Sequence, residues 1–453
     1  MMTLDQALGL LGERAHLVGE GQTLLQRVHS DSRTIQPGDL FVALRGEAFD
    51  GHDYLAAARD AGAAAAMAER GLVEARLSGL QVPDSLAALQ QLAGAWRRRW
   101  SLPLAAVVGS NGKTTVTQMT AAVLQAWLGP AAFATQGNLN NHIGVPLTLL
   151  RLRGHERAGV LELGTNHPGE IALLADLVQP DVVLLNNTQR EHQEFLHGLD
   201  AVARENGSAI AALGATGTVV MPASDPGTAV WRQLAADRRV IEFGLDESGE
   251  VRGQVRWEQD HWHLRLHTPQ GDAETPLHIA GRHNALNGVA AAATALALGA
   301  PLEAVATGLA AFRPVAGRSR TLALPWQGRA LTLVDDAYNA NPDSVIAAID
   351  VLAELPGPHW LILGDMAEVG SQGPQFHREV GRHAAARGIE VVWTFGTQSA
   401  EAANECGARH FTDMDSLQAA LRTDSPAAAS VLVKGSRSMK MERVVRTFQD
   451  AKA

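Results

Sequence analysis

The segment Gly109–Thr115, with the sequence Gly-Ser-Asn-Gly-Lys-Thr-Thr, constrains the fold of this chain more than any other feature. The apolar run 104–108 before it is short enough for a buried parallel strand, and apolar residues recur at helical spacing after it. In such a loop, backbone N–H groups and the positive end of the helix hold phosphates; Lys113 neutralises the transferring phosphate and Thr114 ligates Mg²⁺. The strict motif has glycine where this chain has Val107, and a plain glycine-rich turn is the alternative. A helix opened by Gly-Lys-Thr-Thr favours ATP binding.

Length and composition indicate a soluble, globular protein of about three domains. The 453 residues are 46% hydrophobic and 19% charged, and the net charge of −10 argues against a general nucleic-acid or membrane-surface binder. Cys406 is the only cysteine, which excludes an intrachain disulfide and a thiolate zinc site. The first residues do not resemble a signal peptide, and no apolar stretch reaches the ~18 residues of a spanning helix. We therefore expect a cytoplasmic protein without membrane insertion.

The sequence divides into three blocks that we predict to be domains: 1–100, 101–313 and 314–453. Short strands and an alanine-rich helix over 53–68 indicate a small α/β domain first, and the Trp-Arg cluster at 96–100 is expected to be an exposed helix end. Strands alternate with helices in the other two blocks, which predicts parallel sheets. We expect an α/β fold with a small N-terminal domain, a central phosphate-loop domain and a Rossmann-like C-terminal domain.

Two apolar runs of the central block end in polar residues that are candidates for a site. The run 158–164 carries Glu162, and the run 181–187 is followed by His192. Because ligands bind at the carboxyl ends of parallel strands, the phosphate loop, Glu162 and His192 are expected to share one site. A carboxylate flanked by apolar residues must be paired or metal-bound. His192 taken alone is more typical of a surface loop.

Between about 240 and 280 the sequence changes to a strict alternation of apolar and polar residues. His261, His263 and His267 fall on one face of this segment. A metal site is one interpretation of the three histidines, but a half-exposed antiparallel strand fits the alternation better. We expect a hairpin region attached to the central domain.

The third block predicts a small doubly wound sheet, and its first strand ends in a polar motif at 335–342. This motif holds more carboxylates and amides than a plain turn requires. Asn284, which opens an alanine-rich helix before this block, is a candidate adenine contact, although helix capping is its ordinary role. The expected strands are 330–334, 360–363, 391–395 and 431–433, and the expected helices include 344–355 and 374–387.

Along its entire length the chain resembles the Mur ligase family, ATP-dependent enzymes that form amide bonds in peptidoglycan synthesis. The phosphate loop, the segment 137–141 and the tripeptide 162–164 match the motifs of the family's central domain. The segments 335–344, 363–370 and 434–437 resemble those of the branch that adds D-alanyl-D-alanine to UDP-N-acetylmuramoyl-tripeptide. The Asp-Asn-Pro-Arg signature of the diaminopimelate-adding branch does not occur in this sequence.

The resemblance implies a monomer that joins these two substrates through an acyl phosphate, with ATP and Mg²⁺ and without a nucleic-acid partner. The catalytic residues would be Lys113, Glu162, His192 and Arg318, and the metal ligands Thr114, Glu162 and His192. ATP would contact Gly109, Ser110, Asn111, Gly112, Lys113, Thr114, Thr115, Asn284, Arg318 and Asp336. The UDP-sugar substrate would contact Ser30, Ser32, Arg45, Gly46, Asn138 and Asn141.

At one position the chain departs from the family. Members usually carry, downstream of the metal-binding histidine, a lysine that is carbamylated to help hold a second Mg²⁺; Asn206 stands at that position. No lysine lies between Lys113 and Lys434. Either Glu191 or Glu205 replaces the carbamate, or the second metal is held more loosely. A ligase with another acceptor and a non-catalytic nucleotide or UDP-sugar binder are the alternative functions.

Overall fold

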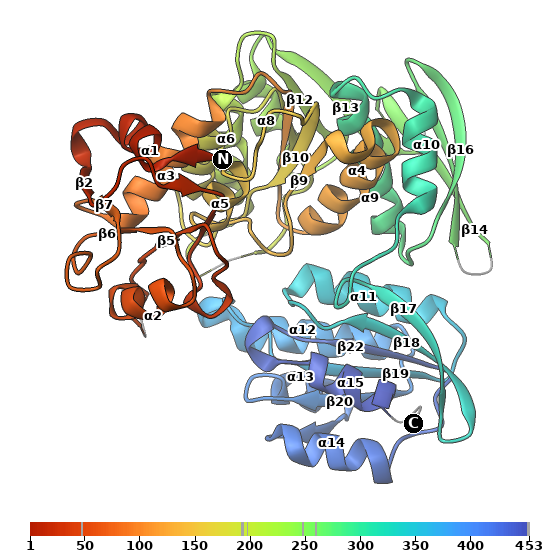
Figure 1. Ribbon diagram of the computed structural model, residues 1–453. Helices are drawn as coiled ribbons and strands as arrows, with labels where there is room; N and C mark the ends of the chain where they lie inside the picture. The colour runs from red at the N-terminus through yellow and green to blue at the C-terminus, as the bar shows by residue number, and fades with distance from the viewer. Residues whose placement is uncertain (47–48, 192–193, 197, 247–248, 259–260, 451–453) are drawn as a thin grey trace.

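The computed structural model describes residues 1–46, 49–191, 194–196, 198–246, 249–258 and 261–450. Three main sheets, of five, nine and six strands, follow one another along the chain and carry helices on their faces (Figure 1). This mixed α/β architecture, with largely parallel sheets, confirms the predicted fold class. We call the parts built around these sheets the N-terminal, central and C-terminal bodies. Within the described ranges, no helix has the length and apolar character needed to cross a bilayer.

The nine-stranded sheet of the central body carries the phosphate loop at the end of an inner strand, the third from one edge. The strand order is β16-β15-β14-β13-β12-β11-β8-β10-β9, and β8 (Leu104–Val108) is apolar and fully buried, as expected of an inner parallel strand. The loop after β8 leads directly into α4 (Lys113–Leu128). The other strands are β9 (Ala132–Ala134), β10 (Ala158–Glu162), β11 (Val182–Leu185), β12 (Thr218–Pro222), β13 (Arg239–Leu245), β14 (Val251–Glu258), β15 (His261–Thr268) and β16 (Gly271–Leu277). The other helices are α5 (Gly144–Leu149), α6 (Glu170–Val178), α7 (Leu199–Gly207), α8 (Thr228–Ala235), α9 (Arg282–Ala297) and α10 (Leu302–Ala311).

The alternating segment between 240 and 280 forms the antiparallel end of this same sheet. β14 pairs with β13 in parallel, and β15 and β16 then continue antiparallel. His263 and His267 of β15 face Glu274 and Asp272 of β16, so their rings pair with carboxylates across the strands. The antiparallel pairing in this segment confirms the prediction. The alternating sequence did not predict that these strands would extend the main sheet of the central body.

The N-terminal body corrects one prediction, the alanine-rich helix over 53–68. Only α2 (Leu55–Asp60) and a preceding 3₁₀ turn are helical, and β6 (Ala65–Ala68) is a fully buried strand. β6 lies between β5 (Asp39–Val42) and β7 (Gly79–Gln81), and this burial within the sheet overrides the helix propensity of alanine. The remaining elements are β1 (Met2–Thr3), α1 (Leu4–Leu11), β2 (His16–Val18), β3 (Leu24–Leu25), β4 (Arg27–His29) and α3 (Ser85–Arg97).

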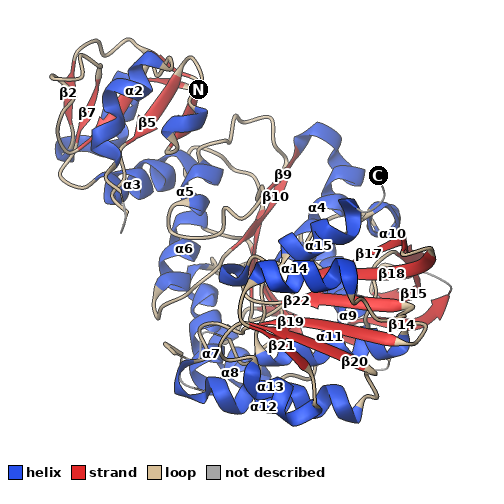
Figure 2. Cartoon of the chain, turned by 90° about the horizontal axis from the view of Figure 1, so that it is seen from below, coloured by secondary structure: helices blue, strands red, loops and turns tan. Residues whose placement is uncertain are grey.

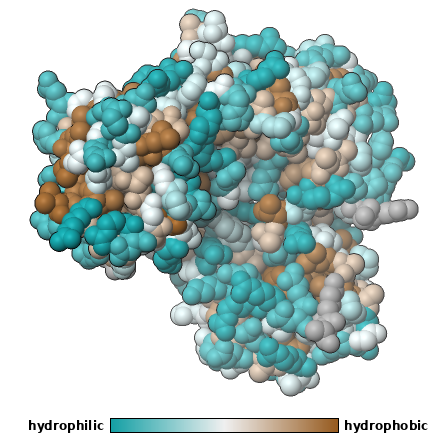
Figure 3. Space-filling model, in the orientation of Figure 1, coloured by the Kyte–Doolittle hydropathy of each residue, from teal (hydrophilic) through white to brown (hydrophobic). Residues whose placement is uncertain are grey.

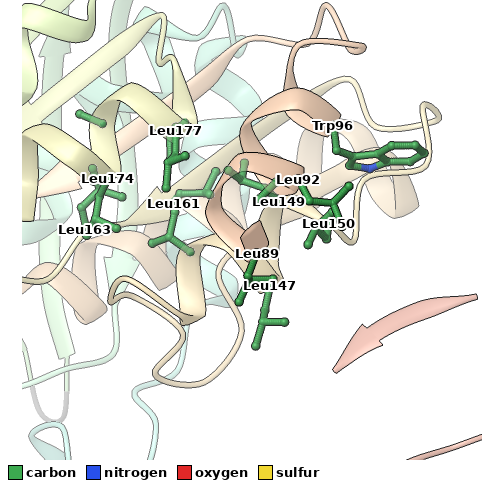
Figure 4. Packing of buried hydrophobic residues seen from close by; sticks show 14 of the residues in the cluster. Leu89, Leu92, Trp96, Leu147, Leu149, Leu150, Leu161, Leu163, Leu174 and Leu177 are labelled. Carbon is green, nitrogen blue, oxygen red and sulfur yellow. The ribbon is translucent and has the colours of Figure 1, made fainter. Parts of the chain in front are cut away.

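Helix α3 joins the N-terminal and central bodies through one shared hydrophobic core. Leu89, Leu92 and Trp96 of α3 lie beside leucines of α5, β10 and α6 (Figure 4). The helix end expected to be exposed is only partly so: Trp96 and Arg97 are buried, with Arg97 6% accessible, whereas Arg98 and Arg99 are exposed. The Arg97 guanidinium donates to the carbonyl oxygens of Trp100, Leu102, Val178 and Gln179, which satisfies its polar groups inside the protein.

The six-stranded sheet of the C-terminal body confirms the four predicted strands and both predicted helices, with ends shifted by a few residues. Its order is β17-β18-β22-β19-β20-β21, parallel except for the β17–β18 hairpin. Figure 2 shows this sheet on one side of the molecule and the N-terminal body on the other, and Figure 3 shows the C-terminal body projecting below the rest. The strands are β17 (Arg320–Trp326), β18 (Arg329–Asp336), β19 (His359–Gly364), β20 (Val391–Phe395), β21 (Arg409–Phe411) and β22 (Ser430–Lys434). The helices are α11 (Pro342–Glu354), α12 (Gly373–Ala386), α13 (Ala400–Cys406), α14 (Met414–Thr423) and α15 (Glu442–Asp450).

Candidate active site

A cavity of about 550 Å³ lies between the central and C-terminal bodies. Strand register explains why its walls converge: Glu162 of β10 is level with Val107 of β8, and Leu185 of β11 is level with Val108. The polar residues that end these strands therefore meet at one edge of the sheet. The predicted site residues that line the cavity are Ser110, Asn111, Gly112, Lys113, Thr114, Thr115, Asn141, Glu162, Asn284, Arg318 and Asp336.

The phosphate loop has the backbone geometry that its glycines allow. Gly112 caps α4 with a left-handed φ of 79°, and a Cβ there would lie 2.8 Å from the Asn287 amide. Asn111 N donates to Asn187 Oδ1 at 2.8 Å, which ties the loop to the end of β11. Lys113 Nζ donates to Ser110 O at 3.0 Å and lies 3.2 Å from Glu191 Oε2. The lysine is thus folded back over its own loop and paired with a buried carboxylate.

Glu162 is buried and hydrogen-bonded, as its apolar flanks predicted. Its Oε1 accepts from Thr114 Oγ1 at 3.1 Å and from Asn140 Nδ2 at 2.7 Å. Thr135 Oγ1 accepts from the Glu162 backbone N–H at 2.9 Å and fixes the end of β10. A hydroxyl and a carboxylate held together at the cavity wall are hard oxygen donors, which fit Mg²⁺.

The opposite wall carries an ion pair that the sequence did not specify. Lys434 Nζ donates to Asp336 Oδ2 at 2.5 Å, and the backbone N–H of Ser319 donates to Oδ1 at 2.9 Å. Burial raises the pKa of Asp336, but the charge and hydrogen bond of Lys434 outweigh it, so the pKa lies below its usual value. Arg318 stacks on the Tyr338 ring, with 4.0 Å between the guanidinium carbon and the ring centroid. Lys434 ends the buried strand β22 just as Glu162 ends β10. A charged residue at the end of an apolar run was therefore a sequence signal that could have predicted Lys434 as a site residue.

Asn284 lies in the first turn of α9 rather than at its cap, which is Gly281. The Asn284 side chain donates to Ala280 O at 2.7 Å and accepts from Asn287 Nδ2 at 3.1 Å. His283, an exposed residue, also lines the cavity beside it. The adenine contact of Asn284 stays a prediction.

Asn206 occupies a buried position behind the phosphate loop. Its Oδ1 accepts from Gly109 N at 3.2 Å, so the side chain supports the loop directly. Glu205 turns the other way and accepts from the backbone N–H groups of Gly169 and Ile171 at the start of α6. Glu205 therefore caps the N-terminus of α6. Glu191, in contrast, lies at the cavity and pairs with Lys113.

Several predicted site residues lie elsewhere. His192 falls outside the described residues. Asn138 is exposed and does not line the cavity, although the neighbouring Asn140 and Asn141 do. The N-terminal candidates Ser30, Ser32, Arg45 and Gly46 belong to the N-terminal body and do not line the cavity either.

Arg45 lies in an exposed cluster of charges on the N-terminal body. Its guanidinium is 2.7 Å from Glu69 Oε2 and 3.6 Å from Asp50 Oδ2. Asp50 also accepts from Arg70 at 2.7 Å. Ser32 starts the 3₁₀ turn that follows β4.

A largely parallel sheet in which an inner strand runs through this loop into a helix defines a P-loop nucleotide-binding protein. The family model of the Mur ligase middle domain matches residues 107–295, that of the glutamate ligase domain matches 317–437, and that of the Mur ligase catalytic domain matches 25–97. The chain belongs to the Mur ligase family.

Curated relatives and solved structures agree with this membership. UDP-N-acetylmuramoyl-tripeptide–D-alanyl-D-alanine ligase of Escherichia coli K12 is 38% identical, over 99% of this chain and 98% of its own length. The enzyme of the same name from Bacillus subtilis 168 is 32% identical, over 94% and 93%. A crystal structure of MurF from Acinetobacter baumannii superposes with a TM-score of 0.90 at 32% identity, covering 99% and 98%. MurF ligase of Thermotoga maritima, solved in complex with ADP, superposes with a TM-score of 0.81 at 26% identity, covering 95% and 99%.

Proposed function

We propose that this enzyme joins D-alanyl-D-alanine to UDP-N-acetylmuramoyl-tripeptide at the expense of ATP, giving the UDP-muramoyl pentapeptide of peptidoglycan synthesis. The cavity carries the proposal, because it sets the phosphate loop of the central body opposite Arg318 and Asp336 of the C-terminal body. Full-length similarity to enzymes named for this reaction supports the choice of substrates.

The reaction proceeds through two displacements. A terminal carboxylate oxygen of the tripeptide attacks the γ-phosphorus of ATP, ADP leaves, and an acyl phosphate forms. The amine of D-alanyl-D-alanine then attacks the acyl carbon, loses a proton, and inorganic phosphate leaves. Lys113 and Arg318 offset the charge that develops on the transferring group, as phosphoryl transfer requires.

Mg²⁺, bound by Thr114 and Glu162, would neutralise phosphate charge when present. Glu191 is our candidate for the anionic group that the family's carbamylated lysine supplies, because it lies at the cavity beside Lys113. The N-terminal body would hold the UDP-sugar through Ser30, Ser32, Arg45 and Gly46, with Asn138 and Asn141 from the central body.

The test is incubation of the full chain with ATP, UDP-muramoyl-tripeptide and D-alanyl-D-alanine, followed by mass measurement of the product. We expect the mass of the pentapeptide and phosphate release that depends on the dipeptide. Phosphate release with a different amine would indicate a related ligase. Nucleotide binding without release under any of these conditions would indicate a non-catalytic binder.

A further inference from the structure

Arg190 of the central body makes several hydrogen bonds to the C-terminal body. Its Nε donates to Asp343 Oδ1 at 3.0 Å, and its backbone N–H donates to Asp343 Oδ2 at 2.7 Å. Nη1 and Nη2 donate to the two carboxylate oxygens of Glu379 at 2.8 and 3.0 Å. The guanidinium also lies over the Phe376 ring, 5.2 Å from its centroid. One side chain thus binds the first turn of α11 and the middle of α12 together.

This contact differs from an ordinary surface ion pair. The Arg190 side chain is 25% exposed, and those of Asp343 and Glu379 are 24% and 35% exposed. Both carboxylates engage the planar guanidinium through more than one bond, a geometry that a lysine does not reproduce. The two hydrogen bonds between the Asn111 and Asn341 amides reinforce the same junction.

The segment that carries Arg190 is itself bonded to the phosphate loop. Ser110 Oγ donates to Gln189 O at 3.1 Å and accepts from Gln189 N at 2.9 Å. Glu191, the residue after Arg190, forms an ion pair with Lys113. Positions 190 and 191 therefore contact opposite partners, the C-terminal body on one side and the loop lysine on the other.

We propose that Arg190 is a positioning residue, which docks the C-terminal body and through Gln189 and Glu191 holds the phosphate loop and Lys113 in their binding geometry. Its loss allows the C-terminal body to separate and the loop to relax, so nucleotide binds less tightly. The proposal rests on the proposed function only in identifying the ligand as an adenine nucleotide.

The test compares Arg190→Ala and Arg190→Lys with Arg378→Ala, a control on α12, the helix that carries Glu379. Arg378 donates to Glu401 at 2.8 Å, entirely within the C-terminal body. Small-angle X-ray scattering gives the radius of gyration of the full chain, and titration calorimetry gives the affinity for ADP at low and high salt. Circular dichroism verifies that each variant is folded.

We expect Arg190→Ala to raise the radius of gyration and to weaken ADP binding about tenfold, with Arg190→Lys intermediate and Arg378→Ala unchanged. Wild-type affinity should fall with salt toward that of Arg190→Ala, because ion pairs are screened. An unchanged radius of gyration would overturn the docking role. A larger radius with unchanged ADP affinity would overturn the coupling to the loop. Neither measurement involves ligation, so failure of the pentapeptide assay would refute the proposed function and leave this inference standing.

Discussion

Lys113 of the phosphate loop and Glu191 of the segment after β11 form an ion pair, with 3.2 Å between Nζ and Oε2, although 78 positions separate them in the chain. The side chains are 15% and 5% exposed, so this cation already has an anionic partner before any phosphate arrives. A bound nucleotide therefore meets a lysine whose position Glu191 already fixes. Affinity for phosphate at this loop depends on both residues.

Replacing Lys113 with alanine is expected to lower the ligation rate by about 100-fold or more, because transition-state charge on the transferring phosphate loses its cation. Phosphate release measured with saturating substrates tests this expectation, and circular dichroism reports whether the fold is retained. The exposed Arg239→Ala serves as a control for loss of positive charge alone. Wild-type turnover in Lys113→Ala would remove the phosphate loop from the mechanism.

Glu162→Gln is expected to weaken catalysis through Mg²⁺, since the substitution keeps the size of the side chain and removes the charge that a hard cation prefers. Higher Mg²⁺ should recover part of the rate. Mn²⁺ binding, followed by electron paramagnetic resonance, supplies a readout that is independent of turnover. The exposed Glu303→Gln is the control, and equal metal affinity in both variants would assign Glu162 a structural role only.

Glu191→Gln and Glu205→Gln are expected to have different effects, because Glu191 lies at the active-site cavity and Glu205 caps a helix. Glu205→Gln weakens two bonds to the start of α6 and should cost about 1–3 kcal/mol of stability, with the Mg²⁺ dependence of ligation unchanged. Glu191→Gln should shift that Mg²⁺ dependence. Thermal unfolding and Mg²⁺ titrations of both variants decide the assignment, and the reverse outcome would exchange the two roles.

Ser32→Ala is expected to raise the KM for the UDP substrate and to leave the KM for ATP near the wild-type value. The reason is position: Ser32 belongs to the N-terminal body and does not line the cavity that holds the phosphate loop. Initial rates with each substrate varied in turn give both constants. A change in the ATP constant alone would show that the two nucleotide sites are assigned to the wrong bodies.

Acidification is expected to destabilise the C-terminal body through His377. This ring is fully buried; Nε2 accepts from Met366 N at 3.0 Å and Nδ1 donates to Gly373 O at 2.7 Å, which requires the neutral form. Burial lowers its pKa below the ordinary 6.5. The unfolded chain therefore binds the proton more readily, and stability present above pH 6.5 is lost as the pH falls below it.

Calorimetric unfolding between pH 7 and pH 5 tests this effect, whose limiting slope for one such group is about 1.4 kcal/mol per pH unit. His377→Gln keeps a donor and an acceptor but does not titrate, so its stability should fall less steeply. The exposed His16→Gln should retain the wild-type slope. Identical slopes for wild type and His377→Gln would contradict the expectation.

The phosphate loop and Glu162 could be predicted because local sequence and the strand-end rule for parallel sheets suffice to place them. The strand Ala65–Ala68 could not, since alanine prefers helices and only its neighbours in the sheet decide otherwise. Arg190 could not be recognised either: its partners lie 153 and 189 positions away, and its charge alone resembles that of any loop arginine. Tertiary contact therefore decides the role of Arg190, whereas Lys434 could have been found from its place at the end of a buried strand.

The core that α3 shares with α5 and α6 gives the three bodies unequal independence. Cutting the chain near residue 100 would expose Leu89, Leu92 and Trp96 to water. It would also remove the carbonyl oxygens of Leu102 and Val178 that accept hydrogen bonds from Arg97. Cutting near residue 313 would divide the chain between separate hydrophobic clusters. Recombination between relatives should therefore be tolerated when it exchanges the last third of the gene, which encodes the C-terminal body. The first two thirds, which encode the N-terminal and central bodies, should be exchanged only together.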